Sequence, residues 1–332
     1  MTVEAPRYSS RDPLREADSE PRCLELAVMP VDSPYASLLA DVPIREAELS
    51  VLGGTTRYWD YGPEDAETII VVAHGYRGEH HGLEPVIAHL ADIRVIGADM
   101  PGFGESSALT EVAHDIAGYA AWLTTFVEKL GLSGRAVIFG HSFGSIIAAT
   151  AVAAGLNTPR LILLNPIAAP ALSGPKALLT WLTVAFYRTA SVLPKRLGDR
   201  LLGNWLAVHF MSATMVKTKD RVLRRWIHDQ HHTYFSNYSD RDTVVAAFDA
   251  SISTDVSVVA PRITVPTLLI GSDQDPITTV AAQRRLQALF PNAQLTILSN
   301  VGHLIHYELP RFAAEEIVAF VGAGRVVDRD QQ

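Results

Sequence analysis

Short apolar runs recur along the chain and alternate with stretches in which apolar residues fall at helical spacing. Continuous apolar runs of about four to eight residues are typical of strands buried on both faces of a parallel sheet. On this basis we expect strands at 68–73, 93–98, 136–140, 161–164, 267–270 and 293–298. Helices are expected at 83–90, 116–130, 146–154, 279–289 and 311–321. The alternation predicts an α/β fold with a mostly parallel central sheet and helices on both faces.

Three regions depart from this alternation. Residues 48–52 and 55–61, joined by Gly53 and Gly54, predict a β-hairpin. Residues 166–260 carry helical spacing without strand-like runs, which predicts an inserted helical cap. The first 22 residues are charged and offer little apolar surface to offset the entropy of ordering.

The predicted organisation therefore has three parts. Residues 1–45 form an N-terminal extension that is partly disordered. The α/β core comprises two segments, 46–165 and 261–325, and the helical cap occupies residues 166–260 between them. The cap helices are expected at 178–193, 201–215 and 222–234. Their aromatic and methionine residues are predicted to form mainly the core of the cap.

Composition narrows the choice of partners and compartment. The chain has 332 residues, 48% of them hydrophobic, and a formal net charge of −8, which argues against a nucleic-acid or membrane partner. The single cysteine, Cys23, allows no intrachain disulfide and no cysteine-rich metal cluster. Neither a signal peptide nor an apolar run of about 18 residues is present, so a cytoplasmic location is expected.

The predicted cap is locally basic, whereas the chain as a whole has a negative net charge. Between Lys176 and Arg225 there are ten basic residues and two acidic ones, Asp199 and Asp220. Such residues are most often the solvated faces of helices, but they could also steer an anionic substrate.

Residues 140–144, with the sequence Gly-His-Ser-Phe-Gly, match the nucleophile elbow, in which a serine sits on a sharp strand-to-helix turn. Gly140 and Gly144 have no side chains, so the two arms of the turn can approach each other. The Ser142 hydroxyl is then exposed above the sheet, beside the N–H groups that begin the helix.

Other polar residues follow the predicted strands in the same way. His74, Asp99, Asp275 and His303, like Ser142, come at or just beyond the carboxyl ends of strands. Reactive groups of open α/β sheets gather at this edge. A functional site is therefore predicted there.

These motifs together resemble the α/β-hydrolase fold superfamily, in its cap-bearing branch of serine esterases and C–C bond hydrolases. The resemblance covers about residues 46–321 and rests on motifs that occur in the order typical of the family. They are His74-Gly75, the Asp99-x-Pro-Gly-x-Gly-x-Ser106 stretch, the elbow, Gly271-x-x-x-Asp275, and Gly302-His303 followed by Glu308-x-Pro310.

The resemblance implies a catalytic triad. Ser142 would be the nucleophile, His303 the general base, and Asp275 the acid that orients the imidazole. Asp273 remains an alternative acid, because this loop is one residue longer than the common form. His306 is a weaker competitor for the base, and His141 is interpreted as structural.

The resemblance also implies an oxyanion hole made by the backbone N–H groups of Tyr76 and Phe143. Arg77 is unusual after the His74-Gly75 motif. It is a candidate ligand for a substrate carboxylate, with a solvated loop arginine as the alternative.

No cofactor is expected, and no metal. His228 and His231 lie three apart on a predicted helix, but the pattern offers no third ligand.

The implied reaction is acyl transfer to water on a small-molecule substrate. A serine nucleophile excludes the branches that form an aspartyl ester, the haloalkane dehalogenases and epoxide hydrolases. Hydrolysis of a carboxylic ester or lactone of a small, largely apolar molecule is the first hypothesis. Two alternatives remain: hydrolysis of a C–C bond in a vinylogous diketone, and a ligand receptor with little catalysis.

Overall fold

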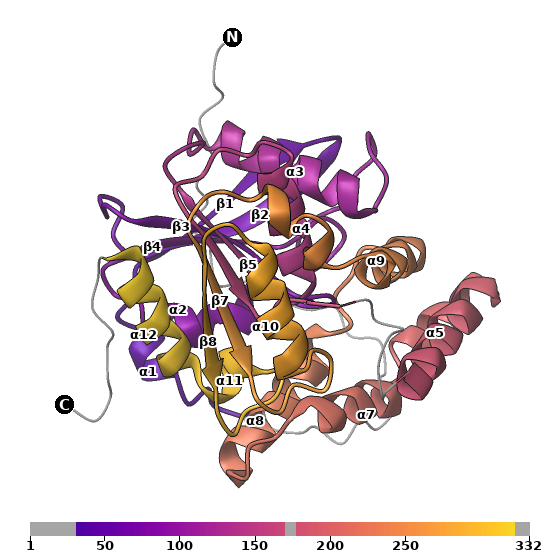
Figure 1. Ribbon diagram of the computed structural model, residues 1–332. Helices are drawn as coiled ribbons and strands as arrows, with labels where there is room; N and C mark the ends of the chain where they lie inside the picture. The colour runs from indigo at the N-terminus through magenta and orange to yellow at the C-terminus, as the bar shows by residue number, and fades with distance from the viewer. Residues whose placement is uncertain (1–30, 170–176, 323–332) are drawn as a thin grey trace, which may run out of the picture.

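The computed structural model describes residues 31–169 and 177–322, and its centre is an eight-stranded sheet (Figure 1). The strand order is β1-β2-β4-β3-β5-β6-β7-β8. The strands are β1 (Ile44–Val51), β2 (Gly54–Tyr61), β3 (Ile69–Ala73), β4 (Arg94–Ala98), β5 (Val137–His141), β6 (Leu161–Leu164), β7 (Thr267–Ser272) and β8 (Ala293–Leu298). β2 runs antiparallel to β1 and β4, and all other neighbours are parallel. The predicted α/β fold class is confirmed, including the hairpin at Gly53.

Alternate residues of the central strands face two separate cores. In β3, Val71 and Ala73 join the core that contains α3 (Ile116–Lys129), α4 (Phe143–Ala153) and α10 (Val280–Leu289). Ile70 and Val72 face the opposite core, with α2 (Glu84–Ile87) and α12 (Pro310–Val321). Burial of both faces explains why the strands are apolar at consecutive positions.

Most predicted helices lie close to their expected ranges, and their ends have local causes. The Asp115 side chain accepts from the Gly118 N–H at the start of α3, and Thr279 accepts from the Ala282 N–H at the start of α10. The expected helix at 83–90 is instead a 3₁₀ turn, η1 (His80–Leu83), continued by the four-residue α2. Two further short helices are α1 (Ala36–Leu39) and α11 (Ile305–Glu308).

Five helices, which we call the inserted helices, lie in the described part of the chain between β6 and β7. They are α5 (Ala177–Val192), α6 (Lys195–Leu202), α7 (Trp205–Met215), α8 (Arg221–Tyr234) and α9 (Arg241–Ser253). Two short 3₁₀ turns, η2 (Val256–Val258) and η3 (Ala260–Arg262), lead from them back to the sheet. The helix expected at 201–215 begins at Trp205 as α7, after a break at Gly203, and neither most of α6 nor α9 was predicted. Figure 1 shows α5 and α7 extending away from the sheet.

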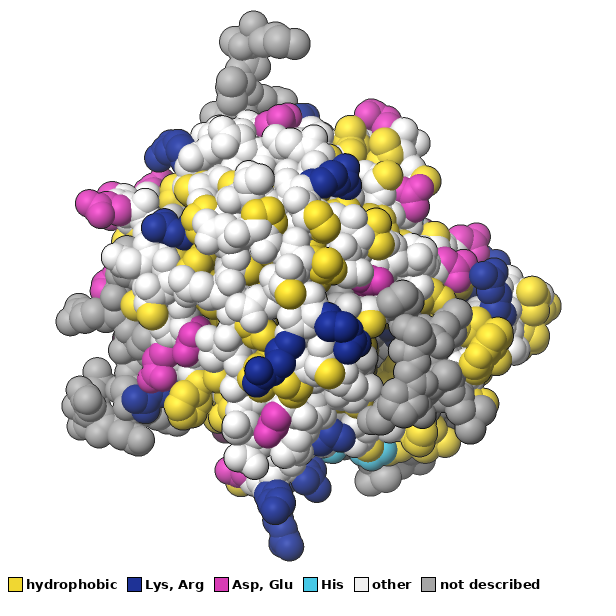
Figure 2. All heavy atoms as spheres, in the orientation of Figure 1, with side chains coloured by type: hydrophobic (Ala, Val, Ile, Leu, Met, Phe, Trp, Pro, Cys, Tyr) yellow, Lys and Arg dark blue, Asp and Glu magenta, His cyan; other side chains and the backbone are white. Residues whose placement is uncertain are grey.

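The aromatic side chains of the inserted helices, which were predicted to form mainly the core of the cap, differ in burial. Tyr187 and Trp226 are buried, whereas Trp181, Trp205 and Phe210 are each more than half exposed. Figure 2 shows hydrophobic side chains gathered where these helices extend to the right. The reason is geometric, because α5 and α7 project from the body and each turns part of its apolar surface outward.

Three expectations fall partly or wholly outside the described residues. The first is the disorder expected at the start of the N-terminal extension, and the second is the surroundings of the single cysteine, Cys23; both concern residues 1–30. The third is the contribution of Lys176 to the basic cap, which lies in residues 170–176. Within the described ranges, no helix is both long and apolar enough to cross a membrane.

Candidate active site

Ser142 lies on the turn between β5 and α4, in a backbone conformation that non-glycine residues rarely adopt. Its φ is 52° and its ψ is −116°. A Cβ added to Gly140 would lie 2.4 Å from the Gly144 carbonyl oxygen, and one added to Gly144 would lie 2.1 Å from the Ala73 oxygen. Both glycines are therefore required by the close approach of the chain around Ser142.

His303 connects Ser142 to an acidic side chain. It lies in the loop between β8 and α11, and its Nε2 is 2.8 Å from the Ser142 Oγ. Its Nδ1 is 2.8 Å from Oδ2 of Asp275. Since an ionised carboxylate only accepts hydrogen bonds, Nδ1 carries the hydrogen and Nε2 accepts from the serine hydroxyl. The imidazole is thereby held in the tautomer that can take a proton from Ser142.

The Asp275 carboxylate is buried and well supplied with hydrogen-bond donors. Its Oδ1 accepts from the N–H groups of Ile277 at 2.7 Å and Thr278 at 3.2 Å. Burial alone would raise the pKa of Asp275, but the facing His303 and these N–H groups bring it below its usual value. Asp275 is therefore ionised at neutral pH.

The structure separates the two candidate acids. Asp273 is exposed, and its backbone N–H donates to the Leu298 carbonyl as part of the β7–β8 edge. Asp275, two residues further along, is the carboxylate that reaches His303.

Asn165 also contacts Asp275 and was not singled out from the sequence. It is fully buried at the end of β6 and donates through Nδ2 to Asp275 Oδ2 at 3.2 Å. Its φ of 46° turns the chain sharply after the strand. A signal existed, because Asn165 is the polar residue directly after the apolar run 161–164, at the edge where polar groups gather.

The two predicted oxyanion donors lie on neighbouring loops. β3 pairs in parallel with β5, with Ala73 opposite Gly140, so the loop that carries Tyr76 and the start of α4 leave the same edge of the sheet. Phe143 is the first residue of α4, and its N–H therefore has no partner within the helix. A Cβ on Gly75 would lie 3.4 Å from the Ser142 Cβ, which shows how closely this loop approaches the serine.

His74 holds the same loop in place. Its Nε2 accepts from the Met100 N–H at 2.8 Å, so the hydrogen lies on Nδ1, which donates to the Gly75 carbonyl at 2.8 Å. The His74-Gly75 pair thus fixes the backbone that leads into Tyr76.

Arg77 has other partners than the predicted substrate carboxylate. The residue is only 2% exposed, and its guanidinium donates to the carbonyls of Phe235 at 2.7 Å and Leu202 at 3.0 Å. It also donates to the Tyr187 hydroxyl at 3.4 Å and lies over the Tyr238 ring. Neither predicted role matches this placement, because Arg77 joins the loop after β3 to the inserted helices.

The remaining histidines of interest make other contacts. His141 and His306 are buried, with ring centroids 4.2 Å apart. In the inserted helices, His228 and His231 each place Nδ1 2.6 Å from the Ser212 hydroxyl oxygen. These two histidines therefore share a serine between them.

The basic residues of the inserted helices lie mostly at the surface. Lys195, Arg196 and Arg200 are exposed, and Arg188 forms a surface ion pair of 3.4 Å with Asp249. This distribution fits solvated helix faces.

Comparison with known proteins places the chain in a family. Residues 68–310 match the alpha/beta hydrolase fold family. The Uncharacterized hydrolase YugF of Bacillus subtilis is 22% identical over 283 residues, covering 81% of this chain and 95% of that protein. The 2-hydroxy-6-oxononadienedioate/2-hydroxy-6-oxononatrienedioate hydrolase 2 of Pseudomonas putida is 27% identical, covering 84% of this chain and 95% of that protein.

Solved structures show the same fold. The esterase EaEST from Exiguobacterium antarcticum is similar with a TM-score of 0.66 and 19% identity, covering 83% of this chain and 99% of the esterase. The enol-lactonase from Burkholderia xenovorans LB400 has a TM-score of 0.65 and 20% identity, covering 83% of this chain and all (100%) of the lactonase. Because the family match spans most of the sequence, the chain belongs to the alpha/beta hydrolase fold family.

Proposed function

We propose that this protein is a serine hydrolase that cleaves a carboxylic ester or lactone of a small, largely apolar molecule. The observation that carries the proposal is the continuous chain from Asp275 through His303 to Ser142, with both contacts at 2.8 Å. A serine hydroxyl is a weak nucleophile, and it becomes reactive when a base accepts its proton as it attacks. The esterase and lactonase similarities are consistent with this chemistry.

In the proposed mechanism, the Ser142 Oγ attacks the substrate carbonyl while His303 Nε2 takes the hydroxyl proton. Asp275 holds the ring and stabilises the imidazolium that forms. The oxyanion of the tetrahedral intermediate accepts hydrogen bonds from the N–H groups of Tyr76 and Phe143. Each such donor contributes about 2.7–4 kcal/mol of transition-state stabilisation in a comparable site.

Breakdown of the intermediate completes acyl transfer. His303 gives its proton to the leaving alcohol oxygen, and the acyl group remains on Ser142 as an ester. Water then attacks this ester while His303 takes its proton. The acid leaves when His303 returns a proton to the Ser142 oxygen, which regenerates the enzyme.

An aromatic cluster beside the serine supports an apolar substrate. The Tyr76 ring contacts Phe143 and Phe103 edge-on, with centroids 6.3 and 5.8 Å apart, and also contacts Phe248 at 5.9 Å. Phe248 belongs to α9, so an inserted helix contributes to this cluster. In this proposal the inserted helices act as the cap that selects the substrate.

The test is hydrolysis of p-nitrophenyl esters of increasing acyl length and of aryl lactones. Ser142→Ala is expected to lower kcat on the order of 10⁴-fold or more. The matched control is Ser251→Ala in α9, where the hydroxyl donates to the Phe248 carbonyl of its own helix turn. This variant should be as active as wild type. Equal rates for wild type and Ser142→Ala on every substrate would refute hydrolysis and favour a ligand receptor.

C–C bond hydrolysis is the second candidate, favoured by the similarity to the Pseudomonas putida hydrolase over 95% of its length. That reaction could use the same three residues. A vinylogous 1,5-diketone in the substrate panel distinguishes the candidates. Cleavage of the diketone with a kcat/KM well above that of every ester would replace the ester proposal with this one.

A further inference from the structure

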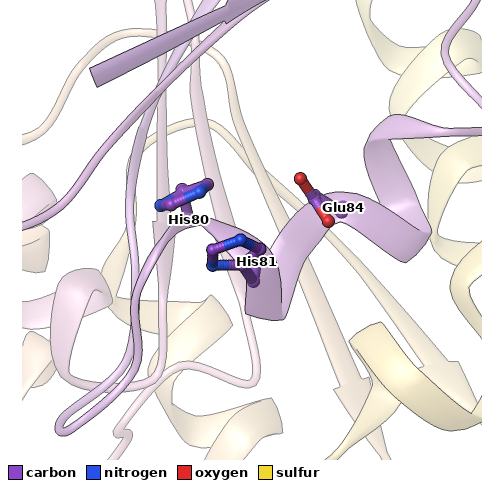
Figure 3. Close-up of side chains that lie close together, drawn as sticks. All are labelled: His80, His81 and Glu84. Atoms are coloured by element: carbon purple, nitrogen blue, oxygen red, sulfur yellow. The ribbon is translucent and has the colours of Figure 1, made fainter. Parts of the chain in front are cut away.

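A second cluster of chemically reactive side chains lies outside the candidate active site. His80 and His81 begin η1, and Glu84 begins α2 directly after it, so one tight turn gathers the three side chains (Figure 3). One ligand atom from each lies within 4.8 Å of the other two. This grouping was not recognised in the sequence, where no metal was expected.

Each imidazole of the cluster is oriented by its own carboxylate. The Nδ1 of His80 lies 2.8 Å from Asp99 Oδ1, and the Nδ1 of His81 lies 2.6 Å from Glu79 Oε1. The carboxylates accept, so each Nδ1 carries a hydrogen and each Nε2 is left with a lone pair. A carboxylate behind a histidine is the usual outer partner of a metal-binding imidazole, because it fixes the tautomer and raises the basicity of the ring.

The rings and the glutamate are also held from the side. His80 stacks on Trp59 with centroids 3.3 Å apart, and His81 stacks on Tyr234 of α8 at 4.4 Å. The Tyr61 hydroxyl donates to Glu84 Oε1 at 3.0 Å. A ligand set restrained in this way loses little conformational entropy when it binds an ion.

Charge and access both favour a cation. Three carboxylates, those of Glu79, Glu84 and Asp99, surround two imidazoles, which leaves an excess of negative charge. His81 and Glu84 line a groove of about 370 Å³ whose other walls include Tyr35, Trp226 and Gln230. An ion can therefore approach His81 and Glu84 from the groove, whereas His80 is buried against the His81 ring, with centroids 3.8 Å apart.

We propose that His80, His81 and Glu84 bind a divalent transition-metal ion, with zinc as the preferred ion. Two imidazole nitrogens and one carboxylate form a ligand set that suits zinc, and three protein ligands leave a fourth position for water or a groove ligand. Asp99 and Glu79 orient the two histidines from behind. The site is separate from the Ser142 chemistry and is proposed independently of it.

The direct test is zinc binding by the tag-free full-length protein after removal of metals with a chelator. Calorimetric titration is expected to give one zinc ion per chain, and zinc in excess of its dissociation constant should raise the Tm by several degrees. Cobalt should bind in its place and give visible absorption typical of a four-coordinate site. A wild-type protein that takes up no zinc at micromolar concentrations would overturn the proposal.

Single substitutions in the cluster test whether the ion binds at His80, His81 and Glu84. Glu84→Gln keeps an oxygen that can accept from Tyr61, and it is expected to weaken zinc binding at least 100-fold, as is His81→Gln. Glu79→Gln leaves all three ligands and should weaken binding about 10–100-fold. Unchanged affinity in Glu84→Gln with normal thermal unfolding would refute the site, and unchanged affinity in Glu79→Gln would refute the orienting role of Glu79.

The matched control is His232→Gln. His232 forms a second close histidine pair, with its Nε2 3.2 Å from Nδ1 of His209 in the inserted helices. Zinc affinity and the cobalt spectrum should be unchanged in this variant. If His232→Gln loses zinc and Glu84→Gln keeps it, the ion belongs to the inserted helices and the proposal is wrong.

Discussion

At the residue scale, Asp273 and Asp275 are two residues apart, and this separation determines which of the two carboxylates contacts His303. Asp275 is buried behind the imidazole and bonded to two backbone N–H groups, whereas Asp273 is exposed on the strand edge. The acid of such a site must be ionised and must meet Nδ1. Only Asp275 satisfies both requirements.

Replacing these two residues therefore has different consequences. Asp275→Asn keeps the side-chain shape but removes the charge and allows the wrong imidazole tautomer, so kcat for ester hydrolysis should fall about 10⁴-fold. Asp273→Asn, the matched control, should change kcat less than about threefold, since its exposed side chain does not contact the site. Steady-state kinetics of both variants provide the measurement, and a larger loss in Asp273→Asn would contradict the assignment.

Motifs in the sequence identified the residues that carry recognisable chemistry, but not those that support them. Ser142, Asp275 and His303 were named from local patterns, and the structure brings them together. Asn165 was missed, because a single asparagine after a strand forms no motif and its contact with Asp275 spans 110 residues. Arg77 was assigned to the wrong environment, since its cap partners depend on packing that no local pattern encodes.

At the element scale, buried strands and their turns were predictable because each imposes a strong local constraint. Burial on both faces makes β3, β5 and β6 apolar throughout, and the turn after β5 demands two glycines. The inserted helices were harder to define. Their boundaries depend on contacts with each other and with the core, so α9 was missed and the break at Gly203 was not seen.

The glycine requirement of the elbow can be tested directly. In Gly144→Ala the new methyl group would lie 2.1 Å from the Ala73 carbonyl oxygen, so the start of α4 must move and the free energy of unfolding should fall by about 1–3 kcal/mol. Gly203→Ala is the control, because its new methyl group meets nothing closer than 3.4 Å. Urea unfolding measures both. Equal stability of the two variants would show that the turn tolerates a side chain.

The contacts of Arg77 predict that its replacement loosens the attachment of the inserted helices to the core. Arg77→Met has a similar length but no donors, so the partly buried carbonyl of Phe235 and the buried carbonyl of Leu202 lose partners, at about 1–3 kcal/mol for the buried group. We expect faster proteolysis within residues 177–253 and a lower Tm. Arg188→Met removes an exposed ion pair and should change stability by less than about 1 kcal/mol. Similar proteolysis of the two variants would contradict the tethering role.

At the scale of the whole molecule, buried imidazoles couple folding to pH. His74, His141, His231 and His306 are all buried, and burial lowers the pKa of each, in the case of His231 to about 3. Below the ordinary histidine pKa of about 6.5, the unfolded chain binds protons that the native protein does not. Stability should therefore decrease as pH falls through that value.

Three other titratable residues set the limits of this effect. Burial lowers the pKa of His81, but its hydrogen bond to Glu79 and the nearby carboxylates raise it more, so this residue opposes the trend. Asp275 and Asp99 have lowered pKa values despite burial, so their stabilising contribution is lost only at more acidic pH, below the ordinary value of 3.8. The histidines should dominate between about pH 6.5 and 4.5.

The expected result is a free energy of unfolding that falls from pH 7 to pH 5 by more than about 1.4 kcal/mol per pH unit, the slope of a single proton. Urea denaturation of metal-free protein at half-unit pH steps measures this slope. His231→Gln removes one buried imidazole beside Ser212. It should reduce the slope by up to the contribution of one proton, about 1.4 kcal/mol per pH unit. His114→Gln is the control, because His114 is only partly buried and should change the slope less. A flat profile from pH 6.5 to 5, or an unchanged slope in His231→Gln, would show that these imidazoles are protonated in the folded protein.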